Sequence, residues 1–279
     1  MRSKTKKLLI PYAFFGFAYF LLFSFFQVIQ GNGISFKPLT ALLFHGTENL
    51  PLESALWFLP ALFFAWVLYT AIWETADKHS RNNIYISATA ITTIGCLFGT
   101  KIYTVGYGGY LFAGMSGVGY MAFGSFLKKT DAIKRMDDCS KARLWMAWML
   151  GMTVYTYTAM KLPGINMRTG KWPLFPISYI IAFAGLILFA ILSFLLTKYL
   201  PRLGKGLQYV GKNSMIFVCT NHPAILVGRK IVGSFCKGGT AVSHILVFLT
   251  AVLVIVALSE IFNRTFLRIF IGKPMKEGN

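Results

Sequence analysis

Hydrophobic residues along the chain form long continuous runs rather than a short alternating period. Eight runs approach the roughly 20 apolar residues that a helix needs to cross the hydrocarbon core of a bilayer. They cover residues 8–30, 52–73, 84–99, 106–127, 144–162, 174–197, 207–227 and 241–262. The pattern predicts an all-α fold, a polytopic transmembrane helix bundle of about eight spans that forms a single domain over residues 1–279.

The composition agrees with a membrane protein. Of 279 residues, 56% are hydrophobic and only 13% are charged, whereas soluble domains carry about 25% charged residues. A soluble enzyme is therefore excluded. The four cysteines lie too far apart for a CxxC metal pair, so neither a metal site nor a disulfide framework is expected. They are Cys96, Cys139, Cys219 and Cys236.

The charge balance predicts an orientation rather than a partner. The chain holds 28 Lys and Arg against 9 acidic residues, a net charge of +19, which in a soluble protein would suggest nucleic acid. Here the basic residues lie between the apolar runs. With the N-terminus inside, 20 of them fall in inner segments and 8 in outer loops. The positive-inside rule then predicts cytoplasmic N- and C-termini in a cell (cytoplasmic or inner) membrane, and no nucleic-acid partner.

The start of the second run carries residues that are unusual in hydrocarbon. Glu53 and Trp57 are four residues apart and would share one face of a helix, which Pro60 continues three residues later. Proline lacks a backbone N–H, so we expect Pro60 to open a kink that faces a cavity. Glu53 and Trp57 are candidates for substrate binding. The alternative is an interfacial tryptophan beside an acid that reaches the headgroups.

The seventh run contains polar residues that should not face lipid. They recur at a spacing of seven, which predicts two polar rows along adjacent faces of one helix. The pairs are Asn213 with Thr220 and Ser214 with Asn221. His222 follows directly, before Pro223, where we expect the helix to be disturbed. Polar and ionisable groups inside a membrane indicate a functional site, although a lone histidine can also be satisfied by packing.

Two further segments have both a functional and a structural interpretation. The outer loop 163–173 combines turn residues with the hydrogen-bonding side chains of Asn166 and Arg168, which suit sugar hydroxyls or an anion; it can equally be a loop that contacts headgroups. The glycine-rich stretch 106–124 does not match a phosphate-binding loop. Close packing of helix on helix through small residues explains it better.

Five blocks of sequence together resemble a known family. They are residues 6–12 (KKLLIPY), 56–63 (LWFLPALF), 120–129 (YMAFGSFLKK), the triplet Asn166-Met167-Arg168, and 209–216 (YVGKNSMI) followed by His222-Pro223. In this order they resemble the acyltransferase 3 family of integral membrane acyltransferases, and more narrowly its fucose 4-O-acetylase-like branch. The resemblance covers nearly the whole chain.

The resemblance implies an enzyme that transfers an acyl group, commonly acetyl from acetyl-CoA, to a sugar hydroxyl of a surface glycan or its lipid-linked precursor. It implies an acyl-CoA donor substrate, a glycan or lipid-linked sugar acceptor, surrounding membrane lipids, and no bound cofactor. Family members carry a histidine, commonly within Gly-His, on a first helix that this sequence does not contain. Relative to the family, we expect the N-terminal two spans to be missing.

The chemistry expected is general-base activation of an acceptor hydroxyl, or a histidine-relayed acyl transfer. His222 is the candidate catalytic residue. The candidates for substrate binding are Glu53, Trp57, Asn166, Arg168 and Asn221. The orientation derived from charge places all six in the outer half of the membrane, which predicts an outward-facing acceptor site with donor entry from the cytoplasm.

Two other functions fit parts of the same sequence. A glycan-precursor transporter or flippase could use the polar seventh run as part of a path, but it should show two-fold sequence symmetry between halves, which we do not find. The second is a truncated, catalytically inactive remnant of the acyltransferase that serves as a membrane scaffold.

Overall fold

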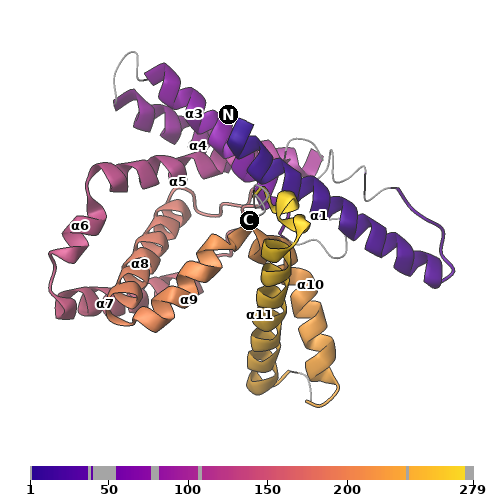
Figure 1. Cartoon of the computed structure of the whole chain (residues 1–279). Helices are drawn as coiled ribbons and strands as arrows, with labels where there is room; N and C mark the ends of the chain where they lie inside the picture. Colours follow the sequence, from indigo (N-terminus) through magenta and orange to yellow (C-terminus); the bar gives the residue numbers. More distant parts are fainter. Residues whose placement is uncertain are drawn as a thin grey trace, which may run out of the picture. The chain divides into compact units, whose positions relative to one another are not determined.

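The computed structural model describes residues 2–36, 39, 55–76, 82–105, 109–236 and 239–273. These residues form helices joined by turns and loops, and among them the only β-type pairing is one isolated bridge (Figure 1). The prediction of an all-α fold is confirmed. The chain divides into two compact units: unit 1 holds residues 1–63 and 212–279, and unit 2 holds residues 64–211.

Unit 1 combines the first helix of the chain with the last ones. It contains α1 (Arg2–Ile29), the start of α3 (Phe58–Ala76), α10 (Ser214–Gly233), α11 (Ala241–Arg264) and the short 3₁₀ helix η2 (Phe266–Ile271). Helices α10 and α11 pack side by side, and η2 packs against both α11 and α1 (Figure 1). The buried core draws on all five elements or their flanking turns. It consists of Leu8, Phe15, Tyr19, Leu56, Leu59, Ile216, Cys219, Phe262 and Ile271.

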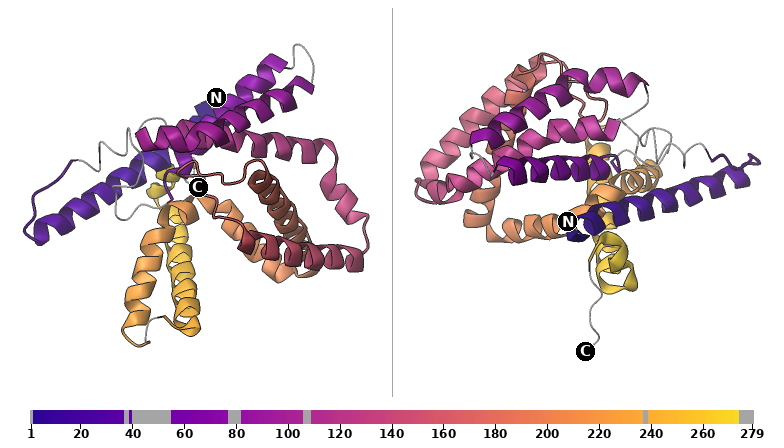
Figure 2. Two further views of the ribbon diagram at one scale, coloured as in Figure 1. Left: turned by 180° about the vertical axis from the view of Figure 1, so that it is seen from behind. Right: turned by 90° about the horizontal axis from the view of Figure 1, so that it is seen from above.

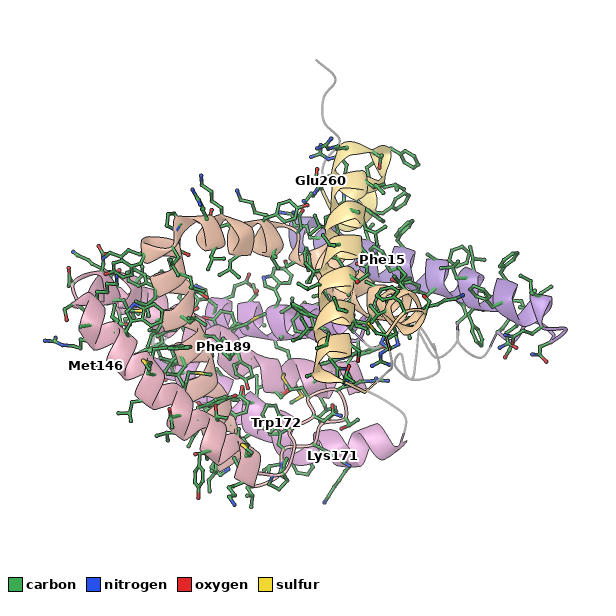
Figure 3. The ribbon with its side chains drawn as sticks, turned by 90° about the horizontal axis from the view of Figure 1, so that it is seen from below. Phe15, Met146, Lys171, Trp172, Phe189 and Glu260 are labelled. Carbon is green, nitrogen blue, oxygen red and sulfur yellow. The ribbon has the colours of Figure 1, made fainter. Side chains whose placement is uncertain are left out.

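Aromatic rings fix α1 to the C-terminal elements of unit 1. The ring of Phe14 stacks on that of Phe270 in η2 at 4.2 Å between centroids. Phe15 stacks on Phe262 of α11 at 5.6 Å, and Figure 3 shows Phe15 on α1 beside α11. Such pairs contribute about 0.5–1.5 kcal/mol beyond their buried area. They therefore hold together segments from opposite ends of the sequence.

Unit 2 is continuous in sequence. After the remainder of α3 come α4 (Asn82–Val105), α5 (Gly109–Lys129), α6 (Ala132–Asp137), α7 (Lys141–Lys161), α8 (Ile177–Tyr199) and α9 (Pro201–Lys212). Helix α4 packs along α5, and α7 along α8 (Figure 2). A second buried cluster joins α3, α4 and α5. Its members are Ile72, Ile84, Ala88, Val118 and Ala122.

Small residues allow the close approach of α4 and α5. A Cβ atom added at Gly95 of α4 would lie 2.6 Å from the Ser116 backbone nitrogen of α5. One added at Gly119 would lie 2.9 Å from the Thr92 hydroxyl oxygen and 2.7 Å from the Tyr179 hydroxyl oxygen. The interpretation of the glycine-rich stretch as a packing surface is thus confirmed at Gly119. Elsewhere in the stretch, Gly124 has no atom within 4 Å of an added Cβ.

Five helices in the described part of the chain are long and apolar enough to cross a membrane. They cover Thr5–Ile29, Phe58–Thr75, Gly109–Lys129, Ile177–Tyr199 and Ala241–Arg264. A shorter apolar stretch, Asn83–Gly99, lies within α4. The two remaining predicted spans coincide with α7 and α10, which are helical but too polar for the same criterion. The protein is therefore a multi-pass membrane protein, and the count of eight spans stays a prediction.

The seventh predicted span is not one helix. The prediction of a continuous helix over 207–227 is wrong, because α9 ends at Lys212, Asn213 forms a turn, and α10 begins at Ser214. Three glycines within α9 lower its helix propensity, and Asn213 has non-helical backbone angles. Thr220 and Asn221 lie on α10, whereas Asn213 precedes it. The predicted row of Asn213 and Thr220 is therefore broken, whereas Ser214 and Asn221 both lie on α10 at the predicted spacing.

The Gly95 contact can be tested by thermal unfolding in detergent, followed by tryptophan fluorescence. We expect Gly95→Ala to destabilise the protein by about 1–3 kcal/mol, because its Cβ forces the α5 backbone outward. Gly124→Ala is the matched control. It adds the same methyl group in open space and should be neutral or stabilising by up to about 1 kcal/mol. Equal midpoints for the two variants would contradict the packing argument.

Candidate functional site

The centre of α10 contains a proline that interrupts its hydrogen-bond ladder. Pro223 has no backbone N–H, so the carbonyl of Cys219, four residues earlier, loses its usual helical partner. The hydroxyl of Tyr19 from α1 donates a hydrogen bond to this carbonyl oxygen at 2.8 Å. Both residues are buried. In a membrane, where water cannot satisfy the carbonyl, the tyrosine supplies the missing donor.

His222 is directly beside this interruption. It lies three residues after Cys219 and so on the same side of α10, which packs in the core that α1 shares. The histidine itself is half-buried. The two ring nitrogens of histidine can accept or donate a proton, which makes an accessible intramembrane histidine suited to general-base chemistry. The predicted catalytic residue therefore lies beside the site in the middle of α10 where the Tyr19 hydroxyl replaces the donor that Pro223 lacks.

Asn221 lies about 100° around α10 from His222. It lines a groove of about 320 Å³ between α10 and α11. The other lining residues are apolar. They are Phe217, Val218, Ile225, Phe248, Ala251, Val252 and Ile255. The amide of Asn221 is thus the polar group of an otherwise hydrophobic groove, where it can orient a ligand by hydrogen bonds.

Trp57 belongs to the turn that precedes α3 rather than to the helix. Its indole is half-buried and lies edge-on to the Phe58 ring at 6.1 Å. The expectation that Pro60 kinks this helix is wrong. Pro60 is the third residue of α3, where no backbone N–H has an intrahelical partner in any case, so its missing N–H costs nothing. Glu53 lies outside the described residues.

In unit 2, the loop 163–173 is a closed turn. The backbone groups of Asn166 and Lys171 exchange two hydrogen bonds, each of 2.9 Å. The side-chain oxygen Oδ1 of Asn166 accepts from the backbone nitrogens of Arg168 at 3.0 Å and Thr169 at 3.3 Å. Asn166 therefore shapes the turn that presents Arg168. Its Nδ2 group is the part of the amide left to donate elsewhere.

The loop is anchored by Trp172. This side chain is 7% exposed and packs with Cys96 of α4 and Tyr179 of α8. Its ring centroid lies 4.9 Å from that of Tyr179. Figure 3 shows the neighbouring Lys171 extending away from the same loop. The turn that carries Arg168 is thus held by a buried aromatic anchor, while Asn166 and Lys171 at its two ends are exposed.

A cavity of about 440 Å³ lies between α4, α5 and the start of α8. Aromatic and small residues dominate its lining, which includes Phe123, Phe126, Phe175, Tyr179 and Phe183. The Tyr179 hydroxyl donates to the Ser116 carbonyl at 2.6 Å and is therefore already engaged. This cavity can accommodate an apolar chain. The sequence did not indicate it, because its lining is assembled from three helices.

A polar cluster also joins the start of α10 to the end of α11. The side-chain oxygen of Asn213 accepts from Asn263 Nδ2 at 2.8 Å and from Lys273 Nζ at 3.1 Å. Lys273 Nζ also donates to Asn263 Oδ1 at 2.7 Å. Burial, together with the nearby positive charge of Arg268, lowers the pKa of Lys273. The sequence indicated Asn213 only as part of a polar row. It did not single out Lys273, which is one of the basic residues assigned to the inner segments.

The five predicted site residues that the structure describes are distributed over both units. Trp57, Asn221 and His222 lie in unit 1, and among the described residues no hydrogen bond joins Trp57 to either of the others. Asn166 and Arg168 lie in unit 2, where the turn brings the Asn166 amide to the Arg168 backbone. The residues whose importance the sequence did not show, Tyr19 and Asn263, act through hydrogen bonds to residues far away in sequence.

The long apolar helices define a multi-pass membrane protein. A family model described as an acyltransferase domain, that of the acyltransferase 3 family, matches residues 1–264. The chain belongs to this family and is a membrane acyltransferase. No curated protein and no solved structure matches the chain.

The bond at the α10 proline can be tested with a double-mutant cycle. Tyr19→Phe removes the donor, so we expect a loss of stability of about 0.6–1.7 kcal/mol in detergent or bilayer. Pro223→Ala restores a backbone N–H to the Cys219 carbonyl, so in that background Tyr19→Phe should cost almost nothing. Thermal unfolding of the four proteins measures the coupling. Strictly additive effects of the two substitutions would show that the tyrosine does not replace the missing donor.

Proposed function

We propose that the protein is a membrane-bound O-acetyltransferase of the fucose 4-O-acetylase-like branch, which transfers acetyl from acetyl-CoA to a sugar hydroxyl of a surface glycan or its lipid-linked precursor. The observation that carries the proposal is the family match over residues 1–264. The ordered blocks at 56–63 and 209–216, the latter followed by His222-Pro223, support the narrower branch.

We further propose eight spans in the cytoplasmic membrane, with both termini in the cytoplasm. The excess of basic residues in the inner segments supports this orientation. The segment that contains α6 is the most basic of them, and Lys134 and Arg135 there are exposed. In this arrangement His222 lies near the middle of α10, within the membrane.

In the proposed reaction, His222 acts as the general base. It removes the proton from the acceptor hydroxyl while that oxygen attacks the thioester carbonyl carbon of acetyl-CoA. The tetrahedral intermediate collapses as the carbon–sulfur bond breaks. The coenzyme A thiolate then takes up the proton, which leaves the sugar acetate and free coenzyme A. The half-buried position of His222 beside Pro223, within the membrane, supports this role.

The remaining candidates are proposed to bind substrate. In unit 1, the indole of Trp57 suits the apolar face of a sugar ring, and Asn221 and Glu53 suit its hydroxyl groups. In unit 2, the rigid turn formed by Asn166 presents the Arg168 guanidinium, whose several N–H groups can bind hydroxyl or anionic oxygens. The buried Trp172 anchor supports a binding role for this loop, because a fixed turn loses little entropy when it binds.

Removing the proposed base is the first test. We expect His222→Ala to lower acetyl transfer by about 10²- to 10⁴-fold, which is the usual contribution of a general base. The assay follows radiolabelled acetyl from acetyl-CoA into the glycan fraction of membranes that contain the whole chain. His244→Ala, at the exposed start of α11, is the control and should keep full activity. Unchanged transfer by the His222 variant at equal protein levels would rule out this role.

The role of the loop 163–173 is tested by substituting each of two basic residues in the same turn. Arg168→Ala should raise the KM for the acceptor about tenfold or more, since each charge-assisted hydrogen bond contributes about 1.5–3 kcal/mol. Lys171→Ala removes a charge from the same loop, but its side chain extends away from the turn, so we expect little change. Similar kinetics for both variants would contradict a specific role for Arg168.

A further inference from the structure

Arg268 in η2 is a half-buried arginine of unit 1 whose guanidinium is only partly satisfied. Its Nε and Nη1 atoms are buried, and neither has a hydrogen-bond partner among the described residues. Burying these two N–H-bearing atoms of a cation is costly, because their N–H groups lose water and gain no partner in exchange. A site that nevertheless keeps such a group points to an anion that binds there.

The backbone around Arg268 is fixed by packing. The Thr265 side chain caps η2 by accepting from the Leu267 nitrogen at 3.3 Å, and Phe270 stacks on Phe14 of α1. Gly272 ends η2 with a φ of 72°, a left-handed conformation that glycine tolerates. A Cβ at this position would also lie 2.7 Å from the Lys7 Cα atom. The chain therefore turns back here, and packing fixes the backbone that carries Arg268.

This turn directs Lys273 to the same region. Its backbone nitrogen donates to the Arg268 carbonyl at 3.1 Å, and its ammonium group is held by the side-chain oxygens of Asn213 and Asn263. Both of these oxygens are neutral. The Arg268 charge contributes to lowering the Lys273 pKa, as expected for two cations that share a site without a carboxylate.

Glu260, the acid of α11, is already paired with a different cation. Glu260 forms an ion pair with Arg264 at 3.0 Å, four residues along the exposed side of α11. In addition, α10 begins directly after Asn213, so the positive end of a 20-residue helix adjoins the cluster. Two cations, an amide pair and a helix N-terminus thus meet in one place.

We propose that Arg268, Lys273, Asn213 and Asn263 form a binding site for a phosphate group. The guanidinium supplies a planar fork for two phosphate oxygens, and the lysine supplies a point charge for a third. The Asn263 amide, which donates to Asn213 in the free protein, can turn to an incoming oxygen. Phosphate fits better than a carboxylate, because it has enough oxygens for all of these donors.

The phosphate can come from two sources. One is the 3′-phosphate or diphosphate of coenzyme A, and this source rests on the proposed function. The other is the headgroup of an anionic phospholipid, because in the proposed orientation the site lies at the inner membrane interface. The chemistry of recognition is the same in both cases, so the experiment has one arm for each source.

In the first arm, coenzyme A and dephospho-coenzyme A are titrated against the purified whole chain. We expect Arg268→Gln and Lys273→Gln to weaken coenzyme A binding about ten- to a hundredfold, the effect of losing one charge-assisted hydrogen-bonding group. Arg264→Gln is the matched control, since that arginine is exposed and pairs with Glu260. Weaker binding of dephospho-coenzyme A would assign the site to the 3′-phosphate, and equal binding to the diphosphate.

In the second arm, thermal unfolding is compared in nanodiscs of phosphatidylglycerol and of phosphatidylcholine. If the phosphate belongs to a lipid, the native chain and Arg264→Gln unfold at a higher temperature in phosphatidylglycerol, and Arg268→Gln loses this difference. A dependence on Arg268 in either arm supports the phosphate site and identifies its source. Binding and stability that are independent of Arg268 in both arms would overturn it.

The stability of Arg268→Gln distinguishes a phosphate site from a purely structural role of this arginine. Phosphate binding by His222→Ala distinguishes this site from the proposed acetyl transfer. Without phosphate, Arg268→Gln should be as stable as the native chain or more so, because it removes an unpaired buried charge. A large loss of stability in detergent, with ligand affinity unchanged in the folded fraction, would instead make Arg268 a structural residue. His222→Ala should still bind the phosphate probes, so failure of the acetyl-transfer mechanism and failure of this site give different results.

Discussion

The hydrogen bond from the Tyr19 hydroxyl to the Cys219 carbonyl determines how unit 1 is assembled. Pro223 creates the need for this bond, since it deprives the carbonyl of its helical donor at a depth where water is absent. The same bond fixes the register of α1 against α10, because Tyr19 must lie level with Cys219. The aromatic contacts of Phe14 and Phe15 with η2 and α11 then follow from that register.

Polar groups in unit 1 support α10 at two places, its start and its middle. At the start of α10, Asn213 ties the helix to Asn263 and Lys273 through side-chain hydrogen bonds. In its middle, Pro223 and Tyr19 set the backbone that carries His222. Both devices join segments far apart in sequence. In each, a polar group that hydrocarbon would not tolerate alone is satisfied by another segment, and function can use what such a site leaves accessible.

The sequence predicted the helices well, because long apolar runs and the charges between them are local signals. It did not predict the break at Asn213. A spacing of seven is compatible with one helix and does not show where the backbone turns. It also assigned a kink to Pro60, although proline in a first turn has no effect on the ladder. Tyr19 and Asn263 could not be identified, because their roles exist only once distant segments meet.

The discontinuity of unit 1 has a consequence for synthesis of the protein. Its first helix leaves the ribosome about 200 residues before its main partners, since Tyr19 and Cys219 are separated by that distance in sequence. Unit 2 is completed in the interval. During this time α1 must wait in the membrane with Tyr19 and the Phe14–Phe15 pair uncovered, which favours temporary shielding by the insertion machinery or a chaperone. Nascent chains interrupted before α10 would keep that surface exposed and would be recognisable as unfinished.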